Sequence, residues 1–178
     1  DVASYDEVLI VGGGKATVSV AQSLEELLGD MIDGGLVVSP IADSLETIEV
    51  VEGSHPTPSE DGRIGAEQIL EMAEDADEST LIIAIITGGG SALLPAPVER
   101  VTIDELTSLT NDLLKSGASI DEINAVRKHI SRIKGGRLAE KAYPARVVGI
   151  LFSDVVGGDP SVIGSGPTAP DTTTFAEA

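Results

Sequence analysis

Two glycine-rich turns, each placed directly after an apolar run, carry the residues best suited to binding anions. One is GGGKA at 12–16, after the run 6–11, and the other is GGGS at 88–91, after the run 81–86. Glycine admits positive φ and lets a ligand approach backbone amides that a Cβ would shield. The alternative is that each is only a tight turn. We expect the two turns to bind phosphate or carboxylate oxygens, so the candidate binding residues are Gly13, Gly14, Gly88, Gly89, Gly90 and Ser91.

Lys15 is the candidate catalytic residue of the first turn. A lysine in the first turn of a helix opposes the helix dipole, so its presence in a lysine-poor chain indicates a function. The turn is not a P-loop, because Leu9 stands in place of the first glycine and Ala16 in place of the hydroxyl that binds magnesium. It is not a dinucleotide fingerprint either, because Thr17 replaces the third glycine and no acid follows the second strand at 39–40.

The serine of the second turn differs from the nucleophile of a hydrolase. The Gly-x-Ser-x-Gly pattern fails at Leu93, and no compelling pair of histidine and aspartate accompanies Ser91. We expect Ser91 to add a hydroxyl donor to backbone amides that hold an anion.

Positive charge is concentrated late in a strongly acidic chain. Seven of the 11 basic residues fall within twenty positions, namely Arg127, Lys128, Arg132, Lys134, Arg137, Lys141 and Arg146. Arginine binds carboxylate or phosphate with two bonds, and lysine supplies a compact point charge. We expect Arg127 and Lys134 to bind an anionic ligand, whereas the other members can equally form a solvated face paired with acids.

Asp154 and Asp159 follow the last apolar run, 146–152. Magnesium sites of nucleotide-using enzymes often take one or two carboxylates together with phosphates, which makes Asp154 the candidate magnesium ligand. The alternative is that these aspartates cap a turn through local bonds. We expect His55 to lie in a surface loop, with contact to a ligand as the alternative, and His129 to be structural.

Alternating strands and helices must position these residues. Apolar runs predict strands at 6–11, 34–38, 47–51, 81–86 and 146–152, and the continuous run 81–86 is typical of a strand buried on both faces. Helical spacing predicts helices over about 16–28, 59–73, 102–115, 120–133 and 137–142. We therefore predict one α/β domain over residues 1–178, a Rossmann-like three-layer sandwich with a mostly parallel sheet flanked by helices. Ligands of such sheets bind beyond the carboxyl ends of the strands, where both glycine turns lie.

The composition excludes several classes of function. A formal charge of -19, from 30 acidic and 11 basic residues, makes nucleic acid an unsuitable partner. No cysteine is present for thiolate chemistry, and the apolar runs are too short to span a membrane. Scattered acids with few lysines and aromatics are typical of proteins from a high-salt cytoplasm, so we expect a halophilic, cytoplasmic protein with an acidic surface.

Seven ordered blocks of the chain resemble glycerate 2-kinases. They are GKA at 14–16, GSHPTP at 53–58, TGGGSALL at 87–94, EINAVRKHIS at 122–131, KGGRLA at 134–139, SDVVG at 153–157 and SGPTAPD at 165–171. The resemblance implies a kinase that uses ATP and Mg²⁺ to phosphorylate the 2-hydroxyl of D-glycerate, giving 2-phosphoglycerate and ADP. It also implies that Lys15 is the catalytic lysine.

The resemblance covers nearly all 178 residues and implies the amino-terminal Rossmann-like domain of a two-domain enzyme. In that family a smaller carboxy-terminal domain closes the cleft, and a further catalytic arginine lies in the part that this chain lacks. We therefore expect the chain to be inactive alone. Glycerate and ATP are the expected small-molecule partners, and a homodimer is left open.

Other functions stay open beside this one. The chain can be a non-catalytic sensor that binds a phosphosugar or a nucleotide, or a kinase that acts on a related hydroxy acid. A dinucleotide-dependent oxidoreductase is disfavoured, because the second strand ends without the acid that holds a ribose.

Overall fold

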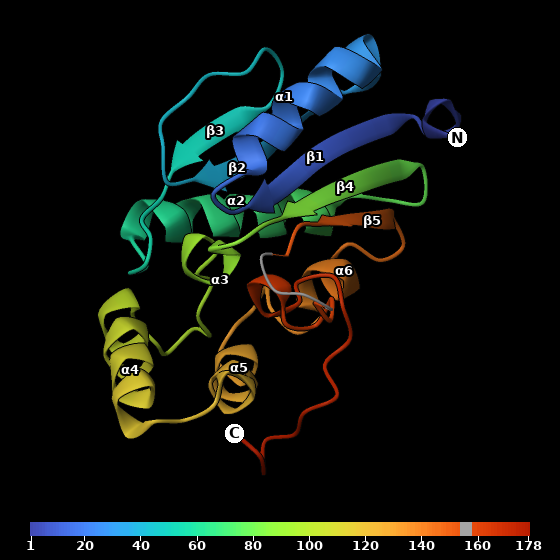
Figure 1. The fold of residues 1–178 in the computed structure, drawn as a ribbon. Helices are drawn as coiled ribbons and strands as arrows, with labels where there is room; N and C mark the ends of the chain where they lie inside the picture. Colours follow the sequence, from blue (N-terminus) through green and yellow to red (C-terminus); the bar gives the residue numbers. More distant parts are fainter. Residues whose placement is uncertain (154–157) are drawn as a thin grey trace.

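Every residue of β4 (Thr80–Ile86) is buried, as its continuous apolar run predicts. The computed structural model describes residues 1–153 and 158–178 and shows why (Figure 1). β4 lies inside a five-stranded sheet of order β3-β2-β1-β4-β5, in which all paired strands are parallel. On one side β4 pairs with β1 (Glu7–Gly13), and β2 (Gly34–Ser39) and β3 (Glu49–Glu52) follow β1 in the sheet. On the other side β4 pairs with the edge strand β5 (Arg146–Leu151).

Helices cover both faces of the sheet, which completes the predicted three layers. One face packs on α1 (Thr17–Leu28), and the other packs on α2 (Glu60–Asp75) and α6 (Arg137–Lys141). Alternate residues of β4 contribute to the two cores. Ile83 and Ile85 belong to the core on the α1 face, and Ile82 and Ile86 belong to the core on the face covered by α2 and α6. The predicted α/β class and Rossmann-like sheet are confirmed.

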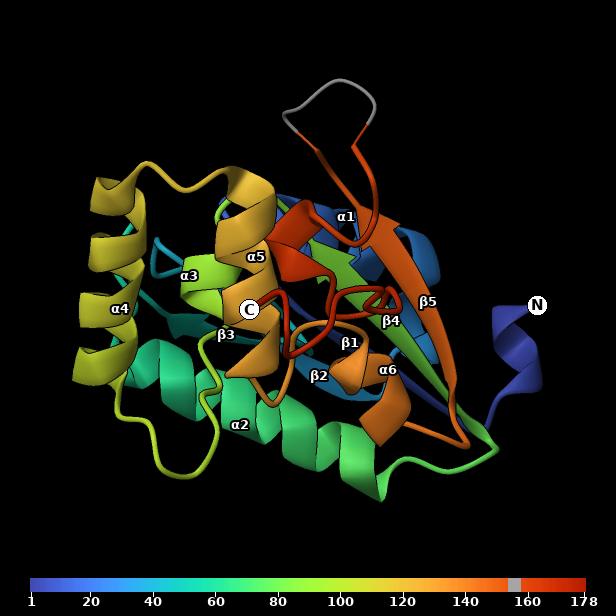
Figure 2. The same ribbon diagram turned by 90° about the horizontal axis from the view of Figure 1, so that it is seen from below.

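The remaining helices lie beyond the carboxyl ends of the central strands. They are α3 (Gly90–Leu93), α4 (Ile103–Ser116) and α5 (Ile120–His129), with short 3-10 turns at Val2–Ser4, Gly29–Met31 and Ile163–Ser165. Figures 1 and 2 show α3 at the ends of β1 and β4, with α4 and α5 further from the sheet. No helix in the described residues is long and apolar enough to cross a membrane.

The strand order creates the position where a ligand is expected. After β3 the chain crosses to the other side of β1 and forms β4, so the connections that leave β1 and β4 diverge. Parallel sheets bind ligands at such a switch point, outside the carboxyl ends of the strands. Both glycine turns follow these two strands and meet there.

Candidate functional site

The two glycine turns are joined to each other by backbone hydrogen bonds. The Lys15 amide donates to the carbonyl of Gly88 at 2.9 Å, and the Thr87 amide donates to the carbonyl of Gly13 at 3.2 Å. The Ala16 amide also donates to the hydroxyl of Thr87 at 3.1 Å. The turn after β1 is therefore fixed against the turn after β4.

The first turn does not present the free amides that its sequence led us to expect. The amides of Gly14, Lys15, Ala16 and Thr17 all donate to protein acceptors. A Cβ on Gly14, whose φ is +144°, would lie 2.0 Å from the Thr87 hydroxyl, and a Cβ on Gly13 would lie 2.6 Å from Leu94 Cγ. These two glycines are explained by close packing of the turns, and what this turn offers a ligand is the exposed side chain of Lys15.

The second turn does keep amides available. Among the described residues, the amides of Gly88, Gly89 and Ser91 have no hydrogen-bond acceptor, whereas the Gly90 amide donates to the Thr87 carbonyl at 3.0 Å. Gly89 has a left-handed φ of +88°. Consecutive free amides around a left-handed residue form a concave site for anionic oxygens. The anion site therefore has fewer amide donors than predicted, because the Gly90 amide is already bonded to Thr87.

A cleft of about 260 Å³ lies beside the second turn. Its walls come from the segment 55–58, from α3 and the residues after it, from α4 and from α5 with the residues that follow it. The polar and charged side chains that line it are His55, Thr57, Ser91, Thr107, Thr110, Asn111, Arg127, Ser131 and Lys134. The rest of the lining is glycine, proline, alanine, leucine and isoleucine.

Two cations line this cleft without a carboxylate partner among the described residues. Lys134 is only 4% exposed, and its Nζ donates to the carbonyl of Leu94 at 2.7 Å. Burial and the nearby charge of Arg127 lower the pKa of Lys134 to about 7. Burial also lowers the pKa of the half-buried Arg127 guanidinium. Buried positive charge without compensation favours an anionic ligand, so the structure brings together the two basic residues that the sequence singled out.

The prediction of one helix over 120–133 is wrong at its end, and the error matters for Lys134. α5 stops at His129, because the Arg132 amide donates to the carbonyl of Ala96 at 2.7 Å and Ser131 forms an isolated bridge with Pro97. The Ser131 hydroxyl then accepts from the amides of residues 133 and 134 at 3.3 and 3.2 Å. Lys134 reaches the cleft from this turn and does not share a helical face with Arg127.

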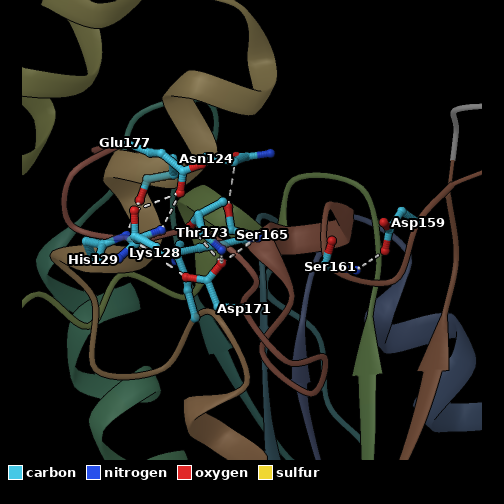
Figure 3. A network of polar contacts seen from close by, with 12 residues as sticks. Asn124, Lys128, His129, Asp159, Ser161, Ser165, Asp171, Thr173 and Glu177 are labelled. Carbon is cyan, nitrogen blue, oxygen red and sulfur yellow. Dashed lines mark hydrogen bonds and ion pairs between the residues drawn. The ribbon is translucent and has the colours of Figure 1, made fainter.

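Four other members of the basic cluster have partners elsewhere, but only Arg132 and Lys141 fit the alternative interpretation of a solvated face paired with acids. Lys128 contacts Asp171 at 3.3 Å (Figure 3), and exposed pairs join Arg132 to Glu67 and Lys141 to Glu74. Arg137 donates to the carbonyls of Lys128 and Lys134 at 2.6 and 3.1 Å. These residues hold α5, α6 and the final segment in place.

The two histidines have different roles in the structure. His129 is structural, as expected, because its Nδ1 lies 2.8 Å from the Ala125 carbonyl and its ring meets Phe175 edge-on at 4.4 Å. His55 is not simply a surface loop residue, since it lines the cleft and lies against Gly89. Partial burial and the charge of Lys15 lower its pKa. The only sequence signal for His55 was its place in the rigid segment GSHPTP.

Ser165 and Asn124 are residues that the sequence did not single out for the site. The hydroxyls of Ser91 and Ser165 are 2.6 Å apart, and Ser165 Oγ donates to Asn124 Oδ1 at 3.1 Å (Figure 3). Ser165 is fully buried and has a left-handed φ of 63°. Serine rarely adopts this backbone conformation. The only signal for it in the sequence was the position of Ser165 between two glycines, Gly164 and Gly166.

The predicted magnesium ligand, Asp154, lies outside the described residues. Asp159 is exposed and accepts a bond from the Ser161 amide at 2.8 Å, as expected for an aspartate that caps a turn. The described part of the chain contains no group of three or more His, Cys, Asp or Glu residues that could hold a metal ion. A site made of one carboxylate and ligand phosphates would not need such a group.

A family profile described as "Domain of unknown function (DUF4147)" matches residues 1–178. The chain belongs to this family. It is 42% identical over 178 residues to the D-glycerate 2-kinase of Thermotoga maritima, covering 98% of this chain and 43% of that protein. It is also 42% identical to the glycerate 2-kinase of Pyrococcus horikoshii, covering 97% of this chain and 39% of that protein.

Two further comparisons complete the DUF4147 assignment. The crystal structure of the Thermotoga maritima glycerate kinase matches with a TM-score of 0.92 and 41% identity, covering 99% of this chain and 43% of that one. A relative from Agrobacterium vitis with a provisional name, hydroxypyruvate reductase, is 42% identical over 96% of this chain and 39% of its own length. The chain therefore spans about two fifths of the curated relatives that it matches.

Proposed function

We propose that this chain is the amino-terminal Rossmann-like domain, residues 1–178, of an ATP-dependent kinase that phosphorylates D-glycerate to 2-phosphoglycerate. The observation that carries the proposal is a single cleft with two regions suited to anions. One region holds Arg127 and Lys134. The other lies at Gly89 and Ser91, whose amides have no acceptor among the described residues, and Lys15 is beside Gly89. A kinase for a hydroxy acid must hold a carboxylate and a phosphoryl group at the same time.

The charges divide naturally between the two groups. Arg127 and Lys134 bind the carboxylate of the acceptor, because an anion offsets the cost of burying two cations. The amides of the second turn and the Lys15 ammonium stabilise the transferred phosphoryl group. Phosphoryl transfer relies mainly on such positioning and on neutralising the charge of the transferred group. The bond from phosphorus to the acceptor oxygen forms, the bond to the ADP oxygen breaks, and the acceptor hydroxyl releases its proton to water.

Mg²⁺ is part of the proposal and would neutralise phosphate charge when bound. Asp154 is its candidate ligand by sequence position, just after β5. A cytoplasmic location, a homodimer and adaptation to high salt also remain predictions.

The test is ADP release from ATP by the full-length protein, measured with D-glycerate and a panel of other hydroxy acids. Glycerate-dependent ADP release, with 2-phosphoglycerate as product, is expected. Turnover with another hydroxy acid alone would assign a related kinase. Thermal stabilisation by ligands without ADP release would favour the non-catalytic sensor.

A second candidate function is favoured by the name hydroxypyruvate reductase, which two relatives from Agrobacterium vitis carry provisionally. Nicotinamide oxidation by the full-length protein with hydroxypyruvate would identify that activity. The turn after β1 argues against it, because its amides are occupied and β2 ends at Ser39 without a following acid.

A further inference from the structure

Ser91, Ser165 and Asn124 form a chain of hydrogen bonds that runs from the cleft into the protein interior. Ser91 lines the cleft, Ser165 is fully buried, and Asn124 is 5% exposed on α5. The three residues come from α3, the turn Ile163–Ser165 and α5, so their contacts are tertiary. The left-handed backbone of Ser165 is the one positive φ outside glycine in the described residues, and it brings the hydroxyl between the two partners.

The number of hydrogens fixes the direction of this chain. Ser165 has one hydroxyl hydrogen and donates it to Asn124 Oδ1, which can only accept. The contact of 2.6 Å between the two serine hydroxyls then needs a hydrogen from Ser91. Ser91 Oγ therefore turns its lone pairs, and no hydrogen, to the cleft.

This direction revises the role expected for Ser91. An oxygen that offers only lone pairs cannot donate to a phosphate, a carboxylate or a ketone, none of which carries a hydrogen. It can accept from a ligand hydroxyl. The backbone amide of Ser91 remains a donor for an anion, so the residue combines two different binding functions.

We propose that Ser91 determines specificity for a hydroxy acid, because its Oγ accepts a hydrogen bond from one hydroxyl of the bound substrate. This inference rests on the proposed function, since it assumes a small hydroxy acid in the cleft. Ser165 and Asn124 are positioning residues that act through Ser91. Sites built to pair with a substrate hydroxyl reject analogues that lack it, because a buried polar atom is then left unpaired.

The test compares D-glycerate with its two monodeoxy analogues, D-lactate, which lacks the 3-hydroxyl, and 3-hydroxypropanoate, which lacks the 2-hydroxyl. Affinities are measured by calorimetry on the full-length protein with ADP present, so that the result does not depend on turnover. For the wild type, one analogue is expected to bind at least about tenfold more weakly than glycerate. In Ser91→Ala, glycerate and that analogue should bind equally, whereas the ratio for the other analogue should not change.

Two variants of the positioning residues test the direction of the chain. Ser165→Gly removes the acceptor for the Ser91 hydrogen and tolerates the left-handed backbone, so the discrimination should fall while the fold is kept. Asn124→Asp keeps an acceptor at the same place and should retain the discrimination. Circular dichroism and thermal unfolding check that each variant is folded. If Ser91→Ala does not fold, the loss of discrimination in Ser165→Gly decides the test.

The possible outcomes distinguish a failure of the role assigned to Ser91 from a failure of the proposed kinase function. If glycerate binds and both analogue ratios are the same in Ser91→Ala and the wild type, the assignment of Ser91 is overturned and the proposed function stands. If glycerate does not bind to the wild type at all, both are overturned. Loss of discrimination in Asn124→Asp as large as in Ser91→Ala would overturn the direction of the hydrogen bonds.

Discussion

Lys15 combines a fixed backbone with a side chain that has no ion-pair partner among the described residues. Its amide is held by the Gly88 carbonyl, and its side chain is exposed next to Gly89. A charge held at this position can contribute to the transition state without contributing to folding.

Replacing Lys15 by alanine in the full-length protein is therefore expected to lower kcat by about 100-fold or more, as for other removed groups that stabilise transition-state charge. The thermal unfolding temperature should not change. Lys115→Ala is the matched control, since Lys115 is an exposed lysine in the last turn of α4. Near-normal turnover of Lys15→Ala would remove Lys15 from the mechanism.

The lowered pKa of Lys134 predicts that binding of an anion is linked to uptake of a proton. Its pKa of about 7 in the free site means that the amine is mostly neutral at about pH 8. A bound carboxylate favours the charged form and raises that pKa, so binding at this pH should take up close to one proton. Below pH 6 the amine is already charged, so the uptake should disappear.

Calorimetry of glycerate binding in buffers with different ionisation enthalpies measures this uptake. Lys134→Arg keeps a charge that does not titrate in this range and should bind without taking up a proton. Equal uptake by the wild type and Lys134→Arg would assign the proton to another group, and His55 would be the next candidate because it lines the same cleft.

At the scale of elements, the final segment, residues 166–178, holds α5, and α5 carries Arg127. Asp171 accepts from the amide and hydroxyl of Thr173 at 3.0 and 2.7 Å, and it pairs with Lys128 (Figure 3). Burial opposes ionisation of Asp171, but the bonds from Thr173 and the charge of Lys128 outweigh it and lower its pKa. Both charged side chains are largely buried, at 6% and 12% exposure.

Asp171→Asn should leave the Lys128 ammonium buried without a counter-charge and destabilise the protein by about 3 kcal/mol in denaturant unfolding. The double variant Lys128→Met/Asp171→Asn should recover part of that loss. Lys141→Gln, which removes only an exposed pair with Glu74, is the control and should have little effect. Equal unfolding curves for Asp171→Asn and the control would contradict the role of the segment.

The sheet and its glycine turns could be predicted because their signals are local. A continuous apolar run marks β4, and glycines mark the turns after β1 and β4. The end of α5 could not be predicted, since it depends on a bond from Arg132 to Ala96, which is far away in the sequence. The occupied amides of the first turn were missed for the same reason, because their acceptors include Thr87 and Val38.

The site was only partly predictable. Arg127 and Lys134 stood out as cations in an acidic chain, and the structure places both in one cleft. Ser165 and Asn124 are uncharged, and their importance follows only from contacts between distant segments. Glycine patterns can indicate an anion site, but they do not show which amides remain free.

The charge of the whole molecule predicts a strong dependence of stability on salt. With a formal charge of -19, self-repulsion opposes the folded state, and salt screens it. The thermal unfolding temperature should rise between about 0.1 M and about 2 M KCl, because the Debye length falls from about 10 Å to less than 3 Å.

An uncharged osmolyte at equal osmolality is the control for effects of excluded solutes. It should raise the unfolding temperature less than KCl does. An unfolding temperature that is independent of KCl would contradict the expectation of a protein adapted to high salt.

The exposure of Lys15 has a consequence for where the chemistry can be efficient. Two unit charges at 4 Å attract by about 1 kcal/mol in bulk water and by about 4 kcal/mol at an effective dielectric constant of 20. Lys15 is exposed in this chain, so water weakens the electric field that it exerts on a phosphoryl group. This chain matches 43% and 39% of the length of the two glycerate 2-kinases, so most of each relative lies outside the matched region. We therefore expect these 178 residues to bind ligands but to lack the dry environment that makes the same charge an effective catalyst.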